Sequence, residues 1–96
     1  MFLSVFTVTD SGLKCSDVGL VDLPTSVECK AAVTDATSFN SNANYKDEFS
    51  GKDFRKGCYI WDRQHGDMYF NEHSTGGRDH LESTRSVCKN GNIICL

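Results

Sequence analysis

Four short segments containing apolar, β-branched or aromatic residues are separated by polar turns, a pattern that predicts β-strands. Four residues ending in Gly66 separate the middle two segments, which favours a β-hairpin because glycine adopts positive φ without strain. Alternate side chains of a strand face opposite sides of the sheet, so Tyr59 and Trp61 would share one face. The predicted strands are residues 1–8, 58–62, 67–71 and 85–89.

A helix is predicted to begin after Pro24, where Thr25 and Glu28 have the spacing of a capping box. Apolar residues then recur at intervals of three and four, which gives the helix a narrow stripe of small side chains able to lie close to a sheet. Because threonines weaken the far end of this stripe, the helix should be short, about three turns. The stripe consists of Cys29, Ala32, Val33 and Ala36.

Residues 38–56 are polar, and the four aromatic residues among them predict a structured loop rather than a linker. The whole pattern predicts an α+β fold, with one short helix packed on a small antiparallel sheet. We expect residues 1–12 to be an N-terminal strand extension and residues 13–96 to be a single cysteine-rich domain. A chain of 96 residues leaves no room for a second independent core.

Charge and hydropathy narrow the classes of partner. The net charge is −3 and the basic residues are scattered, whereas nucleic-acid binding needs a clustered basic surface. The densest basic run, Lys52, Arg55 and Lys56, is predicted to be a solvated loop. No stretch approaches the roughly 18–20 apolar residues of a membrane span. Met1–Val8 lacks the basic start and cleavage site of a complete signal peptide, so we expect a signal removed upstream or a piece of a longer chain.

Five cysteines in 96 residues indicate a small domain stapled by disulfides in an oxidising compartment. A zinc site requires closely paired ligands, whereas four of the cysteines are widely and singly spaced. We therefore expect no metal and no other cofactor. The connectivity stays open, because five cysteines allow fifteen two-bridge pairings with one thiol left over. The four spaced cysteines are Cys15, Cys29, Cys58 and Cys88.

A series of short motifs resembles a cysteine-rich module of uncharacterised secreted and surface proteins of protists, algae and aquatic animals. That module opens with a cysteine and Thr-x-x-Glu-Cys-x-x-Ala. It continues with a variable loop, a Gly-Cys-Tyr strand, a Tyr-Phe-Asn strand and a closing Val-Cys-Lys. The matching positions are Cys15 and residues 25–32, 57–59, 69–71 and 87–89.

The resemblance covers roughly residues 13–89, and Met1–Val8 and Cys95 lie outside it. It implies a non-catalytic extracellular or cell-surface domain, often one of several in a larger chain. Because the four cysteines within the pattern match and Cys95 does not, it also implies two bridges, Cys29–Cys58 and Cys15–Cys88.

A cluster of histidines, acids and arginines is the one candidate for catalysis or metal binding. His73 or His80 beside Glu72 could act as a general acid and base. Arg78 or Arg85 would then stabilise an anion, an inventory similar to that of a small secreted ribonuclease. The strand pattern of such an enzyme is not recognisable, and these residue types are usually solvated in polar loops, so we expect no enzyme. The cluster also includes His65, Asp67 and Asp79.

Three aromatic residues of the predicted hairpin, Tyr59, Trp61 and Tyr69, are the candidate ligand-binding residues. If they are exposed, they offer a platform for a sugar ring or a partner protein. The alternative is that they pack as core beneath the long loop. We therefore expect a non-catalytic extracellular module for binding or adhesion, with a glycan or protein ligand.

A second function stays open, namely a structural subunit of an extracellular filament or other homo-oligomeric assembly. Met1–Val8 is an apolar strand that nothing in the sequence covers, and such a strand can complete the sheet of another copy. An odd cysteine can also bridge two chains. The other interpretation is an internal edge strand, with the odd cysteine paired to a segment absent from this chain. The residues concerned are Phe2, Val5, Phe6, Val8 and Cys95.

Overall fold

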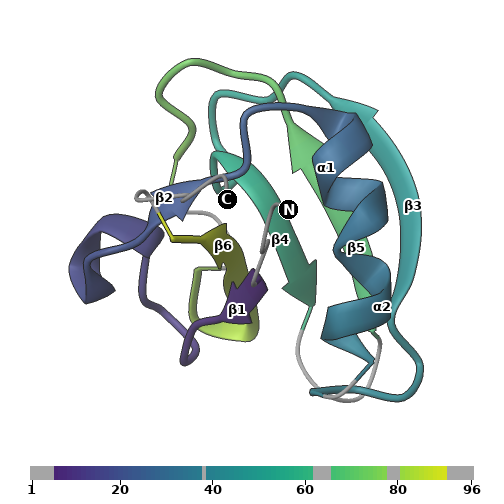
Figure 1. The fold of residues 1–96 in the computed structure, drawn as a ribbon. Helices are drawn as coiled ribbons and strands as arrows, with labels where there is room; N and C mark the ends of the chain where they lie inside the picture. The colour runs from purple at the N-terminus through teal and green to yellow at the C-terminus, as the bar shows by residue number, and fades with distance from the viewer. Residues whose placement is uncertain (1–5, 38, 62–65, 78–80, 91–96) are drawn as a thin grey trace, which may run out of the picture.

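The computed structural model describes residues 6–37, 39–61, 66–77 and 81–90, which build one sheet with helices against one face (Figure 1). The strands are β1 (Phe6–Val8), β2 (Val21–Asp22), β3 (Asn44–Phe49), β4 (Gly57–Trp61), β5 (Asp67–Asn71) and β6 (Thr84–Lys89). The helices are α1 (Ser26–Ala31) and α2 (Val33–Ala36), and the 3-10 turns are η1 (Cys15–Val18) and η2 (Leu81–Ser83). Within the described residues the sheet has six strands in the order β1-β6-β4-β5-β3, and β2 also pairs with β6.

The two helices follow each other directly and cover one face of the sheet (Figure 1). The Thr25 hydroxyl caps α1 by accepting a hydrogen bond from the backbone N–H of Glu28 at 3.2 Å. Small helix residues are fully buried on the sheet, so the predicted fold class, a short helix on a small sheet, is confirmed. The buried core consists of Leu23, Cys29, Ala32, Ala36, Cys58, Ile60, Met68, Phe70 and Val87.

The sheet is antiparallel except for β3, which runs parallel to β5. This edge strand lies inside residues 38–56, which were predicted to form a structured loop. Four of its six side chains are exposed, so it lacks the apolar alternation by which strands are recognised. A short, charged edge strand also resists pairing with another chain.

β1 belongs to the domain's own sheet. It pairs antiparallel with β6, where Val8 lies opposite Val87. The side chains of Phe6 and Val8 pack against the core, which includes Val87 of β6, and they shield part of it from solvent. The described part of the segment is therefore an edge strand of the domain's own sheet.

Two disulfides join the helical elements to the sheet. The Cys29–Cys58 bridge links α1 to β4, and the Cys15–Cys88 bridge links η1 to β6. These are the two pairings implied by the module resemblance. With sequence separations of 29 and 73 residues, the chain-entropy relation gives about 3.6 and about 4.4 kcal/mol of stabilisation. Such bridges indicate an oxidising, non-cytosolic compartment.

None of the helices in the described part of the chain is long and apolar enough to cross a membrane.

Candidate functional site

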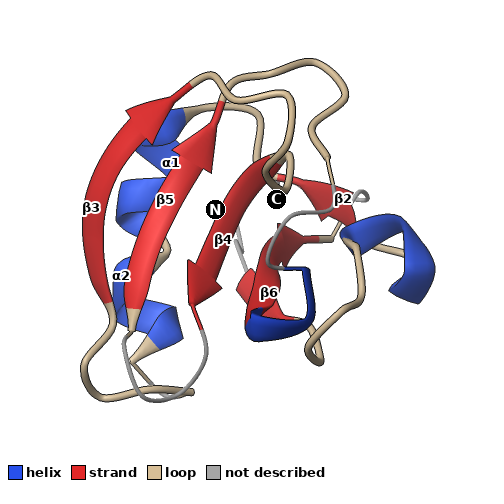
Figure 2. Cartoon of the chain, turned by 180° about the vertical axis from the view of Figure 1, so that it is seen from behind, coloured by secondary structure: helices blue, strands red, loops and turns tan. Residues whose placement is uncertain are grey.

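The helices leave the other face of the sheet uncovered (Figure 2). Aromatic side chains that contact one another are gathered on that face. Ile60 and Met68 pack with the helices in the core, so strand alternation turns their neighbours Tyr59, Trp61 and Tyr69 to the opposite face. Tyr59 and Tyr69 are direct partners in the register of β4 and β5. Tyr59 and Trp61 thus share a face, as predicted, and the register adds Tyr69 to it.

Two phenylalanines extend the cluster, Phe49 at the end of β3 and Phe54 in the loop that follows. The Tyr59 and Tyr69 rings are stacked, with centroids 5.8 Å apart and planes at 29°. The Phe49 ring stands almost at right angles to both tyrosines, at 82° and 85°. Phe54 meets Phe49 edge-on, with centroids 5.6 Å apart. The rings therefore form a corner rather than one flat platform.

These rings line a cavity of about 370 Å³ on the sheet surface, here called the aromatic hollow. Asp47 of β3 is its one charged lining residue among those described. Asp47 lies beside Tyr69 in the parallel register of β3 and β5. The backbone N–H of Glu48 donates a hydrogen bond to Asp47 Oδ1 at 2.8 Å, which orients the carboxylate. The lining residues are Asp47, Phe49, Phe54, Tyr59, Trp61 and Tyr69.

Burial differs between the three predicted aromatic residues. Tyr59 is only 2% exposed, so for this residue the alternative of core packing beneath the long loop applies. Trp61 and Tyr69 are half-buried and keep accessible surface in the hollow. Burial raises the pKa of the Tyr59 phenol far above its usual value, and the nearby Tyr69 raises it further. With almost no exposed surface, Tyr59 forms the buried floor of the hollow, whereas Trp61 and Tyr69 keep accessible surface for a ligand.

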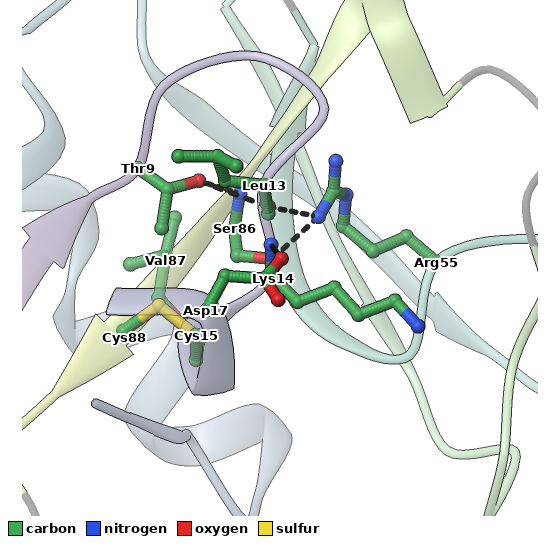
Figure 3. Close-up of a disulfide and its surroundings, with 9 residues drawn as sticks. All are labelled: Thr9, Leu13, Lys14, Cys15, Asp17, Arg55, Ser86, Val87 and Cys88. Atoms are coloured by element: carbon green, nitrogen blue, oxygen red, sulfur yellow. Dashed lines mark hydrogen bonds between the residues drawn. A yellow bond between two sulfur atoms is a disulfide. The ribbon is translucent and has the colours of Figure 1, made fainter. Parts of the chain in front are cut away.

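Arg55 follows Phe54 in the loop between β3 and β4, and it holds this loop in place. Its guanidinium donates hydrogen bonds to the Ser86 hydroxyl at 2.8 Å and to the backbone carbonyl of Leu13 (Figure 3). It also donates to the Thr84 hydroxyl at 3.0 Å. At 3% exposure it is buried, so its assignment to a solvated basic run was wrong, although the two lysines of that run are exposed. The structure thereby ties the loop before β4 to β6.

The histidine and acid cluster is only partly described, since His65, Arg78, Asp79 and His80 lie outside the described residues. Glu72 and His73 border a second cavity of about 580 Å³ beside the start of α1. The pKa of Glu72 is raised, first because its protonated carboxyl donates a hydrogen bond to Glu48 and then because the two carboxyls repel each other when both are charged. His73 Nδ1 accepts a hydrogen bond from the backbone N–H of Gly76 at 3.0 Å, so this atom is engaged in the loop.

The other described members of that cluster lie elsewhere. Asp67 is at the opposite end of β5, where it contacts the Lys46 ammonium at 3.8 Å. The Arg85 guanidinium lies 4.7 Å from the centre of the Phe39 ring. The described residues contain no group of three or more His, Cys, Asp or Glu side chains that could hold a metal ion.

Of the residues proposed for self-association, some lie in the described part of the chain and others do not. Phe6 and Val8 contact the core of their own domain, and this contact occupies them within the chain. Phe2, Val5 and Cys95 lie outside the described residues.

Three lining residues of the hollow, Asp47, Phe49 and Phe54, were not singled out from the sequence. Each lies in the stretch assigned to a loop, and the only signal was the aromatic content of that loop. No protein-family model matches this chain, and no curated protein or solved structure matches it either.

Proposed function

We propose that this chain is a non-catalytic extracellular binding module whose ligand enters the aromatic hollow. One observation carries the proposal: five aromatic residues from two strands, the end of a third and a loop converge on one cavity, on the face that the helices leave uncovered. Aromatic side chains dominate the energetics of binding sites because they bury large areas with little conformational freedom to lose.

The size and stiffness of the hollow support this function. A cavity of about 370 Å³ lies within the range of small ligand sites, roughly 300–1,000 Å³. It is large enough for one ring or one side chain. The Cys29–Cys58 bridge and the buried Arg55 fix the strand and loop that carry its walls. A preformed site loses little entropy on binding.

The disulfides support an extracellular location, since small secreted domains depend on such staples. The resemblance to a secreted cysteine-rich module supports the same location and a role without catalysis.

Arrays of glycans and peptides test the proposal, probed with the disulfide-bonded wild-type chain and two variants. Tyr69→Ala removes one wall of the hollow, and Val27→Ser changes an exposed residue of α1 on the other face of the sheet. We expect the wild type and Val27→Ser to bind the same spots and Tyr69→Ala to lose them. Binding that survives Tyr69→Ala, or wild-type protein that binds neither array, would contradict a ligand site in the hollow.

A further inference from the structure

We propose that the group bound in the aromatic hollow is a cationic side chain, arginine or lysine, presented by a partner protein. This inference rests on the proposed function and names the chemistry of its ligand.

The arrangement of the rings carries the first step. A cation is attracted to the face of an aromatic ring when it lies within about 6 Å of the centroid. Phe49 stands at 82–85° to the stacked tyrosines, so a cation in the corner can approach ring faces from more than one direction. A sugar ring prefers an extended flat surface and brings hydroxyl groups that need several polar partners. The perpendicular rings interrupt such a surface.

The charge of the hollow carries the second step. Among the described residues that line the hollow, Asp47 is the one with a charged side chain. The register of β3 and β5 places it beside Tyr69. Its carboxylate lies at the hollow, where it can accept hydrogen bonds from a guanidinium or ammonium group. Within the described residues, Arg55 is a cation that interacts electrostatically with Tyr59, and it directs its donors to Leu13, Thr84 and Ser86. The chain as a whole carries a net charge of −3, which favours approach of a basic segment.

The same kind of contact already occurs on the helix side of this small sheet. The Lys30 ammonium lies 5.4 Å from the centre of the Tyr45 ring, and the Arg85 guanidinium lies 4.7 Å from that of Phe39. The cavity volume suits one such side chain, with its alkyl stem against the phenylalanines. A sheet face with aromatic walls and a carboxylate thus matches a basic side chain in shape and in charge.

A pair of short glycine peptides, one with a central arginine and one with citrulline, provides the test. Citrulline keeps the length and planar end of arginine but has no charge. Binding is followed by the emission of Trp61, the single tryptophan of the chain, which lines the hollow. We expect the arginine peptide to bind about tenfold more tightly, a factor equivalent to about 1.4 kcal/mol. Two oligosaccharides, maltotriose and chitotriose, are titrated in the same way for comparison with the peptides.

Two variants assign the preference to the hollow. Asp47→Asn keeps the side-chain shape and the acceptor for the Glu48 N–H but removes the charge, so the arginine preference should fall to about threefold or less. Tyr69→Leu keeps apolar bulk and removes a ring face, and it should weaken the arginine peptide more than the citrulline peptide. Val27→Ser should change neither.

Equal binding of the arginine and citrulline peptides overturns the proposal of a cationic ligand. Tighter binding of an oligosaccharide, lost in Tyr69→Leu, also overturns it but leaves the hollow as a ligand site. A response to none of these probes overturns the cationic ligand, while the arrays still decide the proposed function separately.

Discussion

Asp47 on β3 lies directly beside Tyr69 on β5, in the one parallel strand pair of the described sheet. This pairing places an acidic residue beside a tyrosine whose ring is stacked on that of Tyr59. The juxtaposition depends on the strand register, because a shift by one residue would turn Asp47 to the helix face. The chemistry of the aromatic hollow is therefore set by where β3 docks.

Removal of Arg55 should destabilise the domain strongly. Arg55→Met would leave the Thr84 and Ser86 hydroxyls without their donor in a buried site. Hydrogen bonds to charged groups contribute about 1.5–3 kcal/mol each, so we expect a loss of about 3 kcal/mol or more in urea unfolding. Arg55→Lys should not restore the loss, since an ammonium cannot reproduce the guanidinium fork. Lys52→Met, an exposed change in the same loop, should stay within about 0.5 kcal/mol. A mild effect of Arg55→Met would mean that the loop is held by other contacts.

Deletion of residues 1–8 should impair folding rather than assembly. The deletion removes β1, which pairs with β6, and exposes core that Phe6 and Val8 cover. Each Å² of apolar area left exposed costs about 25 cal/mol. Circular dichroism should show a lower melting temperature or an unfolded chain, and sedimentation of the full chain should give a monomer. A truncated protein that stays folded and monomeric, beside a full chain that forms oligomers, would instead support the structural-subunit alternative.

The sequence predicts β4 and β5 as strands, but it does not predict β3. Alternation is a local property, so Tyr59 and Trp61 could be assigned to one face from the order of residues alone, whereas Tyr69 joins them through the register of β4 and β5. The docking of β3 is a long-range event, and the polar sequence of an exposed edge strand carries no matching signal. Arg55 shows the same limit, because its burial depends on acceptors about 30 or more residues away in Leu13, Thr84 and Ser86.

The paired carboxyls of Glu48 and Glu72 should make stability depend on pH. The hydrogen bond between them raises the pKa of Glu72 in the folded state, above an unfolded value of about 4.3. The folded state therefore binds the proton more tightly, so this contribution is fully present below the unfolded pKa and is lost as pH rises through the folded pKa.

Glu72→Gln keeps a hydrogen-bond donor for Glu48 at every pH. Its melting temperature should consequently fall less between acidic and neutral pH than that of the wild type. Glu82→Gln, which removes an exposed acid elsewhere, should leave the wild-type profile unchanged. Parallel profiles for Glu72→Gln and the wild type would show that the pair does not share a proton.

Gly66 should tolerate no side chain. Its φ is +69°, and an added Cβ would lie 2.6 Å from the Asn42 backbone, in the segment that leads into β3. Gly12 has a φ of +84° but open space around it. Gly12→Ala therefore incurs only the left-handed strain of about 1–2 kcal/mol, whereas Gly66→Ala adds a clash. Thermal unfolding should show the larger loss for Gly66→Ala, and equal losses would mean that the close approach to Asn42 is relaxed in solution.

Chemical-shift mapping with the arginine peptide tests the central claim most directly, namely that the aromatic hollow binds a cationic side chain. The resonances of Trp61, Tyr69 and Asp47 should move most on titration, and those of Val27 on the helix face should stay fixed. Shifts concentrated instead around Pro24, Lys56 and His73, which line the second cavity, or no shifts at all, would contradict the account.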